Sequence, residues 1–192
     1  MRVYFGVCGV GLGHVGRCIP VAKKLIARGD ETLFSTYNDA CDYVNHEDIP
    51  FIEAPPIYFA VKNSGEVDFR QTTVYPGAFS LIIFFNQVNA EIKYMRSFRP
   101  DIVVSDSRAS TITAAKLLGL PIIVILNLYR AKIPRERRFL RLARIADGGI
   151  LTVVGRVWNL GREILIPDFP EPYTISLESL RIPRPYRRLV KM

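Results

Sequence analysis

Hydrophobic and polar positions along the chain follow two alternating spacings. Short apolar segments rich in β-branched and aromatic residues, typical of buried strands, are separated by stretches with apolar residues every three to four positions, typical of amphipathic helices. The predicted strands are 2–7, 32–36, 51–53, 102–105, 122–126 and, more weakly, 150–154. The predicted helices are 16–28, 39–45, 78–98, a short helix ending at Leu118, and 134–146. This alternation predicts an α/β fold, a doubly wound parallel sheet with helices on both faces.

Two segments depart from the alternation. Residues 55–77 contain Pro, Gly, Asn and Ser without a clear period, which indicates a long loop, and the helix after it opens on the apolar run 81–85. That run is too broad for one buried stripe, so we expect some of it to be exposed or covered by the loop. Prolines become frequent from residue 166, which favours an extended tail over another strand and helix. We therefore expect a domain at 1–165 and a Pro/Arg-rich tail or interdomain linker at 166–192.

Composition narrows the class of protein. The chain has 192 residues, 49% hydrophobic and 23% charged, which suits one globular domain with an ample core. The run 81–85 is too short to span a bilayer, and the first residues lack the features of a signal peptide. Cys8, Cys18 and Cys41 are odd in number and lack metal or redox spacing. We expect them to be reduced thiols in a cytoplasmic protein.

The net charge of +8 is unevenly distributed. Basic and acidic residues balance through Tyr129, whereas the remaining residues hold fourteen Lys or Arg against six acids. This asymmetry favours a local anionic partner.

A glycine-rich segment, GVCGVGLGHVGR from Gly6 to Arg17, joins the first strand to the first helix. Gly9, Gly11 and Gly13 predict a tight loop whose backbone N–H groups, with the helix N-terminus, face an anion. The loop fits a Rossmann-like fold and the G-x-G-x-x-G pattern of dinucleotide sites. The second strand, however, ends without the acidic residue that holds the ribose hydroxyls. A ligand role is favoured; a non-catalytic nucleotide- or dinucleotide-binding module and a purely structural turn are the alternatives.

His14, on this loop, is the leading candidate for a catalytic residue, because a neutral imidazole can accept a hydroxyl proton. The alternative is a histidine that only hydrogen-bonds across the loop. Asp106 follows the fourth strand, and the carboxyl ends of parallel strands share one crevice. Asp106 is therefore expected to approach His14, hold its N–H and fix its tautomer. An N-cap of the next helix is an equally weighted role for Asp106, and the two are compatible.

Other candidates follow the fifth strand. Asn127 and Tyr129 fall on the same rim and suit contacts with polar groups of a substrate, or the closure of a turn. Four arginines of the helix at 134–146 lie together: Arg137, Arg141 and Arg144 at helical spacing, with Arg138 adjacent. Such a stripe is often plain solvated surface, but it also suits anionic lipid headgroups.

Several partners are not expected. The chain has no aromatic-basic interleaving or known module for nucleic acid. It also has no Asp-x-Asp motif or histidine cluster to hold a metal, and no cofactor is expected.

The motifs together resemble a known family. The opening VCGVGLGH, with Pro20 in what we expect to be the first helical turn and Arg28-Gly29 at the end of that helix, resembles the N-terminal half of GT-B glycosyltransferases. It is most similar to the branch of MurG-like (glycosyltransferase family 28) proteins and related archaeal hypothetical proteins. RPDIVVSD, ending at Asp106, resembles the second landmark of that half, and IPDFP at 166–170 resembles the segment leading out of it.

The resemblance implies a single GT-B N-terminal domain that binds the acceptor of a nucleotide-sugar-dependent transfer. His14 and Asp106 match the positions of the base and its supporting acid in plant enzymes of this fold, and the glycine loop matches one that faces an acceptor's diphosphate. The donor-binding half has no counterpart in these residues, so we expect it as a partner, from the same or a separate chain. We expect this chain alone to be inactive. Exposed apolar residues beside a basic stripe add the expectation of a lipid-linked acceptor at the inner face of a membrane.

Overall fold

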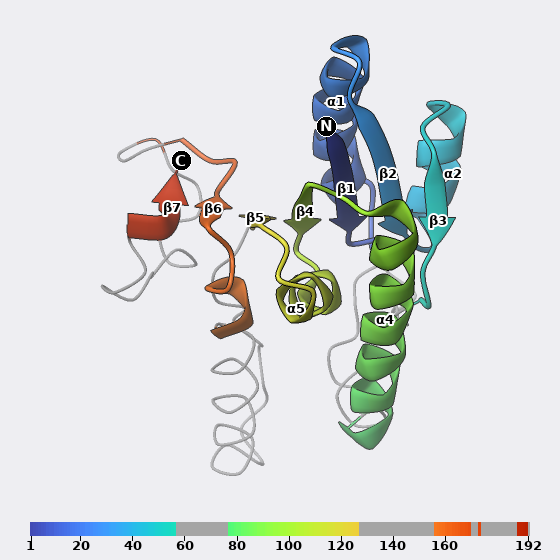
Figure 1. Cartoon of the computed structure of the whole chain (residues 1–192), viewed down its shortest axis with the longest axis vertical. Coiled ribbons are helices and arrows are strands. Elements are labelled where there is room, and N and C mark those ends of the chain that lie inside the picture. Colours follow the sequence, from blue (N-terminus) through green and yellow to red (C-terminus); the bar gives the residue numbers. More distant parts are fainter. Residues whose placement is uncertain (57–76, 127–155, 170–172, 174–187, 192) are drawn as a thin grey trace.

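The computed structural model describes residues 1–56, 77–126, 156–169, 173 and 188–191, with side chains of the helix at 77–98 described from residue 82 (Figure 1). Within these residues, seven strands form one sheet in the order β3-β2-β1-β4-β5-β6-β7, and every neighbouring pair is parallel. The strands are β1 (Arg2–Val7), β2 (Glu31–Thr36), β3 (Phe51–Glu53), β4 (Ile102–Asp106), β5 (Ile122–Ile125), β6 (Glu163–Leu165) and β7 (Val190–Lys191). The predicted Rossmann-like parallel sheet is confirmed.

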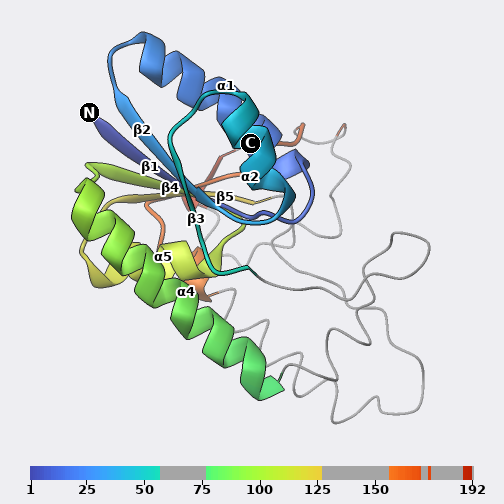
Figure 2. The same cartoon turned by 90° about the vertical axis from the view of Figure 1, so that its right-hand side faces the viewer.

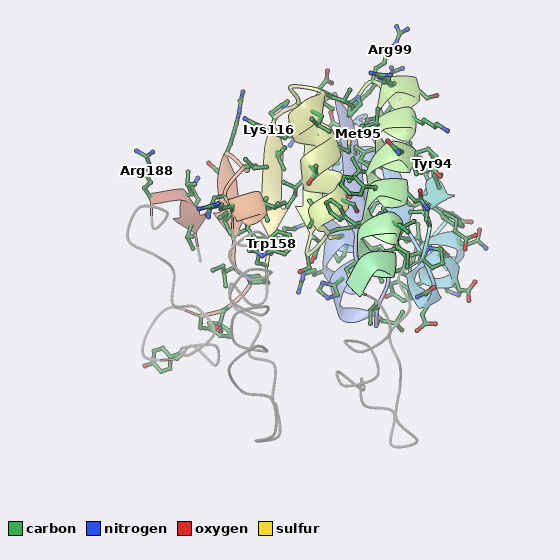
Figure 3. All side chains as sticks on the ribbon, turned by 90° about the horizontal axis from the view of Figure 1, so that it is seen from below. Tyr94, Met95, Arg99, Lys116, Trp158 and Arg188 are labelled. Atoms are coloured by element: carbon green, nitrogen blue, oxygen red, sulfur yellow. The ribbon has the colours of Figure 1, made fainter. Side chains whose placement is uncertain are left out.

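Helices cover both faces of this sheet (Figure 2). They are α1 (Gly13–Ala27) and α2 (Asp39–His46) on one face, and α4 (Gly77–Phe98) and α5 (Ala109–Leu117) on the other. The alternation of side chains along β1 explains the two cores: Val3 and Phe5 pack under α1 and α2, whereas Tyr4 packs with Met95 of α4. Figure 3 shows Met95 in the layer between α4 and α5, while Arg99, just beyond α4, projects outward.

The first helix begins earlier than its periodicity predicts, at Gly13 instead of Gly16. His14 therefore lies in the first helical turn. The expectation that Pro20 lies in or near the first turn is wrong, because Pro20 is inside α1. It lacks the N–H that would bond the carbonyl of Gly16, so the helix carries one unpaired ladder position there.

Two strands escaped the sequence analysis, β6 and β7. β6 has three residues, and β7 has two and lies in the proline-rich stretch predicted to be a tail. The register pairs Leu165 with Lys191, so part of 166–192 belongs to the sheet. The predicted loop at 55–77 (apart from its ends), the helix at 134–146 and the strand at 150–154 lie outside the described residues.

The apolar start of α4 is partly exposed. Ile82 and Phe85 are 55% and 58% exposed, whereas Val88 and Met95 further along the helix are buried. This agrees with the expectation that the apolar run exceeds one buried stripe. Among the described helices, none is long and apolar enough to cross a membrane.

Candidate functional site

The carboxyl ends of β1 and β4 lie side by side at the centre of the sheet (Figure 1). The register pairs Val7 with Asp106, and the N–H of Cys8 donates to the carbonyl of Asp106 at 3.0 Å. The glycine loop begins at this point and returns into α1. The site is therefore built on the central strand, β4, and its neighbour β1.

Gly9 has a packing reason to be glycine. A Cβ on Gly9 would lie 1.8 Å from the carbonyl oxygen of Tyr37, which follows β2. Gly11 is required by conformation, since its φ of 71° lies in the left-handed region, while nothing lies near a Cβ placed on Gly11 or Gly13. The loop is therefore packed tightly against the end of β2 at Gly9, whereas the space around Gly11 and Gly13 is open.

His14 and Asp106 are in hydrogen-bond contact. Nδ1 of His14 lies 2.8 Å from Oδ1 of Asp106, although the two residues are 92 positions apart. The imidazole is one-fifth exposed and the carboxylate is fully buried. The predicted approach of Asp106 to His14 is therefore present, with the carboxylate buried and the imidazole ring partly exposed to solvent.

Arg17, which was not among the candidates predicted from the sequence, completes the cluster. Its Nε donates to Oδ2 of Asp106 and its Nη2 to Oδ1, both at 2.5 Å. Nη2 also lies 2.8 Å from His14 Nδ1. His14 and Arg17 in the first turns of α1 therefore both face Asp106 at the end of β4 and are only about one-fifth exposed. The available signal was the i, i+3 spacing of His14 and Arg17, which places both on one face.

The electrostatics of the cluster favour an ionised Asp106. Burial raises the pKa of this carboxyl, but hydrogen bonds from His14 and Arg17 and the charge of Arg17 outweigh it, so the pKa lies below its ordinary value of 3.8. The thiol of Cys18 donates to Oδ2 at 3.5 Å. Burial and the nearby carboxylate raise the pKa of Cys18 well above its ordinary value. The site therefore holds a carboxylate anion beside a neutral thiol.

Asp106 does not cap the next helix, so that alternative is wrong. The N-cap position of α5 is Arg108, and no side chain caps this end. Between them, Ser107 adopts a φ of 54°, and Asn38, after β2, adopts a φ of 53°. Left-handed backbone at non-glycine residues is costly and concentrates at functional sites. Both residues follow strand ends at the edge that carries His14.

A second polar cluster lies buried below the site. Arg108, the residue before α5, points inward and is 2% exposed. Its guanidinium donates to the backbone and side-chain oxygens of Ser35 and lies 2.9 Å from the carboxylate of Glu91 in α4. Thr111 donates to the other oxygen of Glu91. The only sequence signal was an acidic residue at a core-facing position of an apolar helix.

A cavity of about 230 Å³ adjoins the first cluster at the carboxyl ends of β5, β6 and β7. Most of its walls are apolar, and Arg17 and Lys191 contribute the charged groups. Its lining residues are Arg17, Ile125, Leu165, Ile166, Pro167 and Lys191. Arg17, which also binds Asp106, is the residue that this cavity shares with the first cluster.

The remaining candidates lie outside the described residues: Asn127, Tyr129, Arg137, Arg138, Arg141 and Arg144. Within the described part of the chain, no three His, Cys, Asp or Glu side chains gather as a metal site requires.

Comparison with known sequences gives consistent matches. Residues 1–140 match the sequence model of a family described as "Glycosyl transferase family 1". An uncharacterized glycosyltransferase of Methanosarcina mazei is 30% identical over 94% of this chain and 46% of its own length. A second, from Methanosarcina acetivorans, is also 30% identical, over 94% of this chain and 46% of its own length. The chain thus spans about half the length of the curated relatives it matches.

Solved structures of low identity share the fold. MurG of Acinetobacter baumannii superposes with a TM-score of 0.56 at 17% identity, covering 88% of this chain and 42% of that one. The glycosyltransferase SsfS6 of Streptomyces sp. SF2575 gives 0.58 at 17% identity, covering 91% and 53%. In both, the match covers about half of the solved chain.

Proposed function

Since the chain belongs to glycosyl transferase family 1, we propose that it is the acceptor-binding half of a nucleotide-sugar-dependent glycosyltransferase. The observation that carries this proposal is the 2.8 Å contact between His14 and Asp106 at the central strand ends, with the imidazole accessible and the carboxylate buried. A base held in this way suits the activation of a hydroxyl group.

The proposed reaction is a direct displacement. With Nδ1 of His14 donating to Asp106, Nε2 keeps its lone pair and takes the proton of an acceptor hydroxyl. The hydroxyl oxygen forms a bond to the anomeric carbon of the sugar, and the bond from that carbon to the nucleoside diphosphate breaks. The electron pair leaves with the diphosphate, and Asp106 stabilises the imidazolium that forms. His14 is thus the catalytic residue, and Asp106 positions it.

The cavity beside Arg17 suits the apolar part of an acceptor whose hydroxyl faces His14. Its aliphatic walls favour a hydrocarbon group, and the amides of the glycine loop suit an anionic group on the same molecule. A lipid-linked acceptor combines the two. The exposed Ile82 and Phe85 of α4 support a location at the inner face of a membrane.

The donor-binding half is proposed to come from residues beyond the matched region or from a partner chain. More than half the length of each curated relative lies outside the match, which supports this division. On this proposal, the 192-residue chain binds acceptor but transfers no sugar.

A thermal-shift screen tests the proposal. Farnesyl phosphate, UDP-glucose, UDP-N-acetylglucosamine and NAD are each added to the purified chain. We expect stabilisation by farnesyl phosphate, a short lipid-linked anion, and none by the UDP-sugars. Stabilisation by a UDP-sugar would contradict the acceptor-half assignment, and stabilisation by NAD alone would favour the dinucleotide-binding module. Sugar transfer by the purified chain would contradict the need for a donor half.

The assignment of His14 needs a separate test in an enzyme reconstituted with a donor half. His14→Ala is expected to lower turnover about a hundredfold or more, with a much smaller change in acceptor affinity. His46→Ala is the matched control, because the side chain of His46 is 86% exposed and far from the cluster in sequence.

A further inference from the structure

Two groups compete for the same nitrogen of His14. Nδ1 lies 2.8 Å from Oδ1 of Asp106 and 2.8 Å from Nη2 of Arg17, and these two partners lie 2.5 Å from each other. The three atoms form a closed triangle. A carboxylate can only accept a hydrogen bond and a guanidinium can only donate one, so Nδ1 cannot satisfy both at once.

Each partner selects a different tautomer. When Nδ1 carries the proton, it donates to Asp106, and Nε2 has a free lone pair. When Nδ1 lacks the proton, it accepts an N–H from Arg17, and Nε2 carries the proton instead. Only the first form can accept a proton from a substrate through Nε2. The balance between the two forms thus decides what fraction of the protein has a base available.

The geometry makes this competition close. Nη2 has two N–H bonds, so it can donate to Oδ1 and to Nδ1 together. Each tautomer gains one hydrogen bond at 2.8 Å and suffers one contact between like groups: N–H against N–H, or lone pair against lone pair. The charges of Arg17 and Asp106 oppose each other at similar distance from the ring. Nδ1 thus has an acceptor and a donor at equal distance, in contrast to a histidine held by a carboxylate alone.

We propose that Arg17 is a positioning residue that sets the tautomer balance of His14 by competing with Asp106 for Nδ1. The inference rests on the proposed function only for its effect on turnover, because the tautomer is a property of the chain itself. Arg17 also lines the cavity, so a ligand bound there contacts the residue that sets the tautomer balance of His14.

Nuclear magnetic resonance of the ring nitrogens tests the proposal without any substrate. The chain has two histidines, so His46→Gln leaves His14 as the sole source of imidazole signals. With ¹⁵N-labelled histidine at a pH where the ring is neutral, protonated and unprotonated nitrogens give well-separated resonances. We expect both tautomers to be populated, with intermediate shifts for both nitrogens. A ring protonated at Nδ1 alone would overturn the proposal, with no further variant needed.

Two substitutions in the His46→Gln background give opposite expectations. Arg17→Met keeps the length of the side chain but removes the competing donor, and is expected to raise the Nδ1–H to Nε2–H ratio about tenfold, as the loss of a charged hydrogen bond implies. Asp106→Leu is expected to lower that ratio. An unchanged ratio in a folded Arg17→Met chain would overturn the proposal. Failure of sugar transfer in the reconstituted enzyme, with the expected ratios intact, would instead count against the proposed function.

Discussion

The tight contact at Gly9 allows a stability prediction in which two glycines of one segment differ sharply. A methyl group at Gly9 would lie 1.8 Å from the carbonyl oxygen of Tyr37, 2.6 Å from its carbonyl carbon and 2.8 Å from an atom of its ring. Relief of the first contact to an ordinary distance of 3.4 Å requires a shift of about 1.6 Å. The obstacle is backbone, so no side-chain rotation can provide that shift.

The magnitude follows from what has to move. Overpacking of a core by one methyl group costs about 1–3 kcal/mol when side chains can yield. Here the peptide after Tyr37 must move, and the next residue, Asn38, already has a φ of 53°. We therefore expect Gly9→Ala to destabilise the fold by about 3 kcal/mol or more. For a chain of this size, that lowers the melting temperature by about 6–12 °C.

Gly16→Ala is the matched control. Gly16 lies inside α1, its φ is not in the left-handed region, and nothing lies within 4 Å of a Cβ placed there. Alanine is the better helix former by about 1 kcal/mol, so this variant is expected to be slightly more stable than the parent. Urea unfolding of the parent and both variants, followed by circular dichroism, measures the difference. A Gly9→Ala chain within 0.5 kcal/mol of the parent would refute the argument from this contact.

Four further predictions follow from other features. In the reconstituted enzyme, Asp106→Asn is expected to lower turnover about a hundredfold, since the amide no longer stabilises an imidazolium; full activity would leave Asp106 a structural residue. The pKa of Asp106 is lowered in the folded state, so the ionised carboxylate stabilises the fold fully above the unfolded pKa near 3.8, and this stabilisation is lost as the pH falls below that value. Urea midpoints measured between pH 3 and 7 should therefore drop less steeply in Asp106→Asn than in the parent. Glu91→Ala leaves the buried Arg108 cation without its counter-charge and is expected to cost about 3–5 kcal/mol in the same unfolding assay; a cost below 1 kcal/mol would contradict the importance of this pair. Co-sedimentation with vesicles is expected to need anionic lipid and to fall with salt. It is also expected to weaken in a triple alanine variant of Arg137, Arg141 and Arg144. Equal recovery in the supernatant under all conditions would contradict binding to a membrane surface.

Much of the fold could be predicted because periodicity reports burial directly. β1 and β3 have the predicted bounds, and β2, β4 and β5 differ by a single residue. In β1, β4 and β5, most residues are apolar, as expected of strands covered by helices on both faces. Glycine obscured the start of α1: Gly13 and Gly16 carry no hydrophobic signal and weak helix propensity, yet the helix begins at the first of them. β6 and β7, of three and two residues, were not predicted, although the equally short edge strand β3 was.

The site was predictable in part, and the division has a physical cause. The approach of His14 to Asp106 follows from topology, because adjacent parallel strands end at one edge. The position of Arg17 did not follow, because a basic residue in an amphipathic helix normally faces water, whereas Arg17 pairs with the buried Asp106 of another element. Glu91 is a similar case: a buried carboxylate is unfavourable until its partner Arg108 is known, and that partner comes from another element.

The central position of β1 has a consequence for the order in which the molecule assembles. β1 is the first strand in the chain, and β2, from Glu31, can pair with one of its edges early, but its other edge is paired only by β4, from Ile102. During synthesis, an apolar strand with unpaired N–H and C=O groups therefore remains open over a long stretch of translation. Open edges of this kind recruit other strands and promote aggregation. The closing of that edge by β4 also brings Asp106 to His14, so the step that protects the nascent chain is the same step that creates the site.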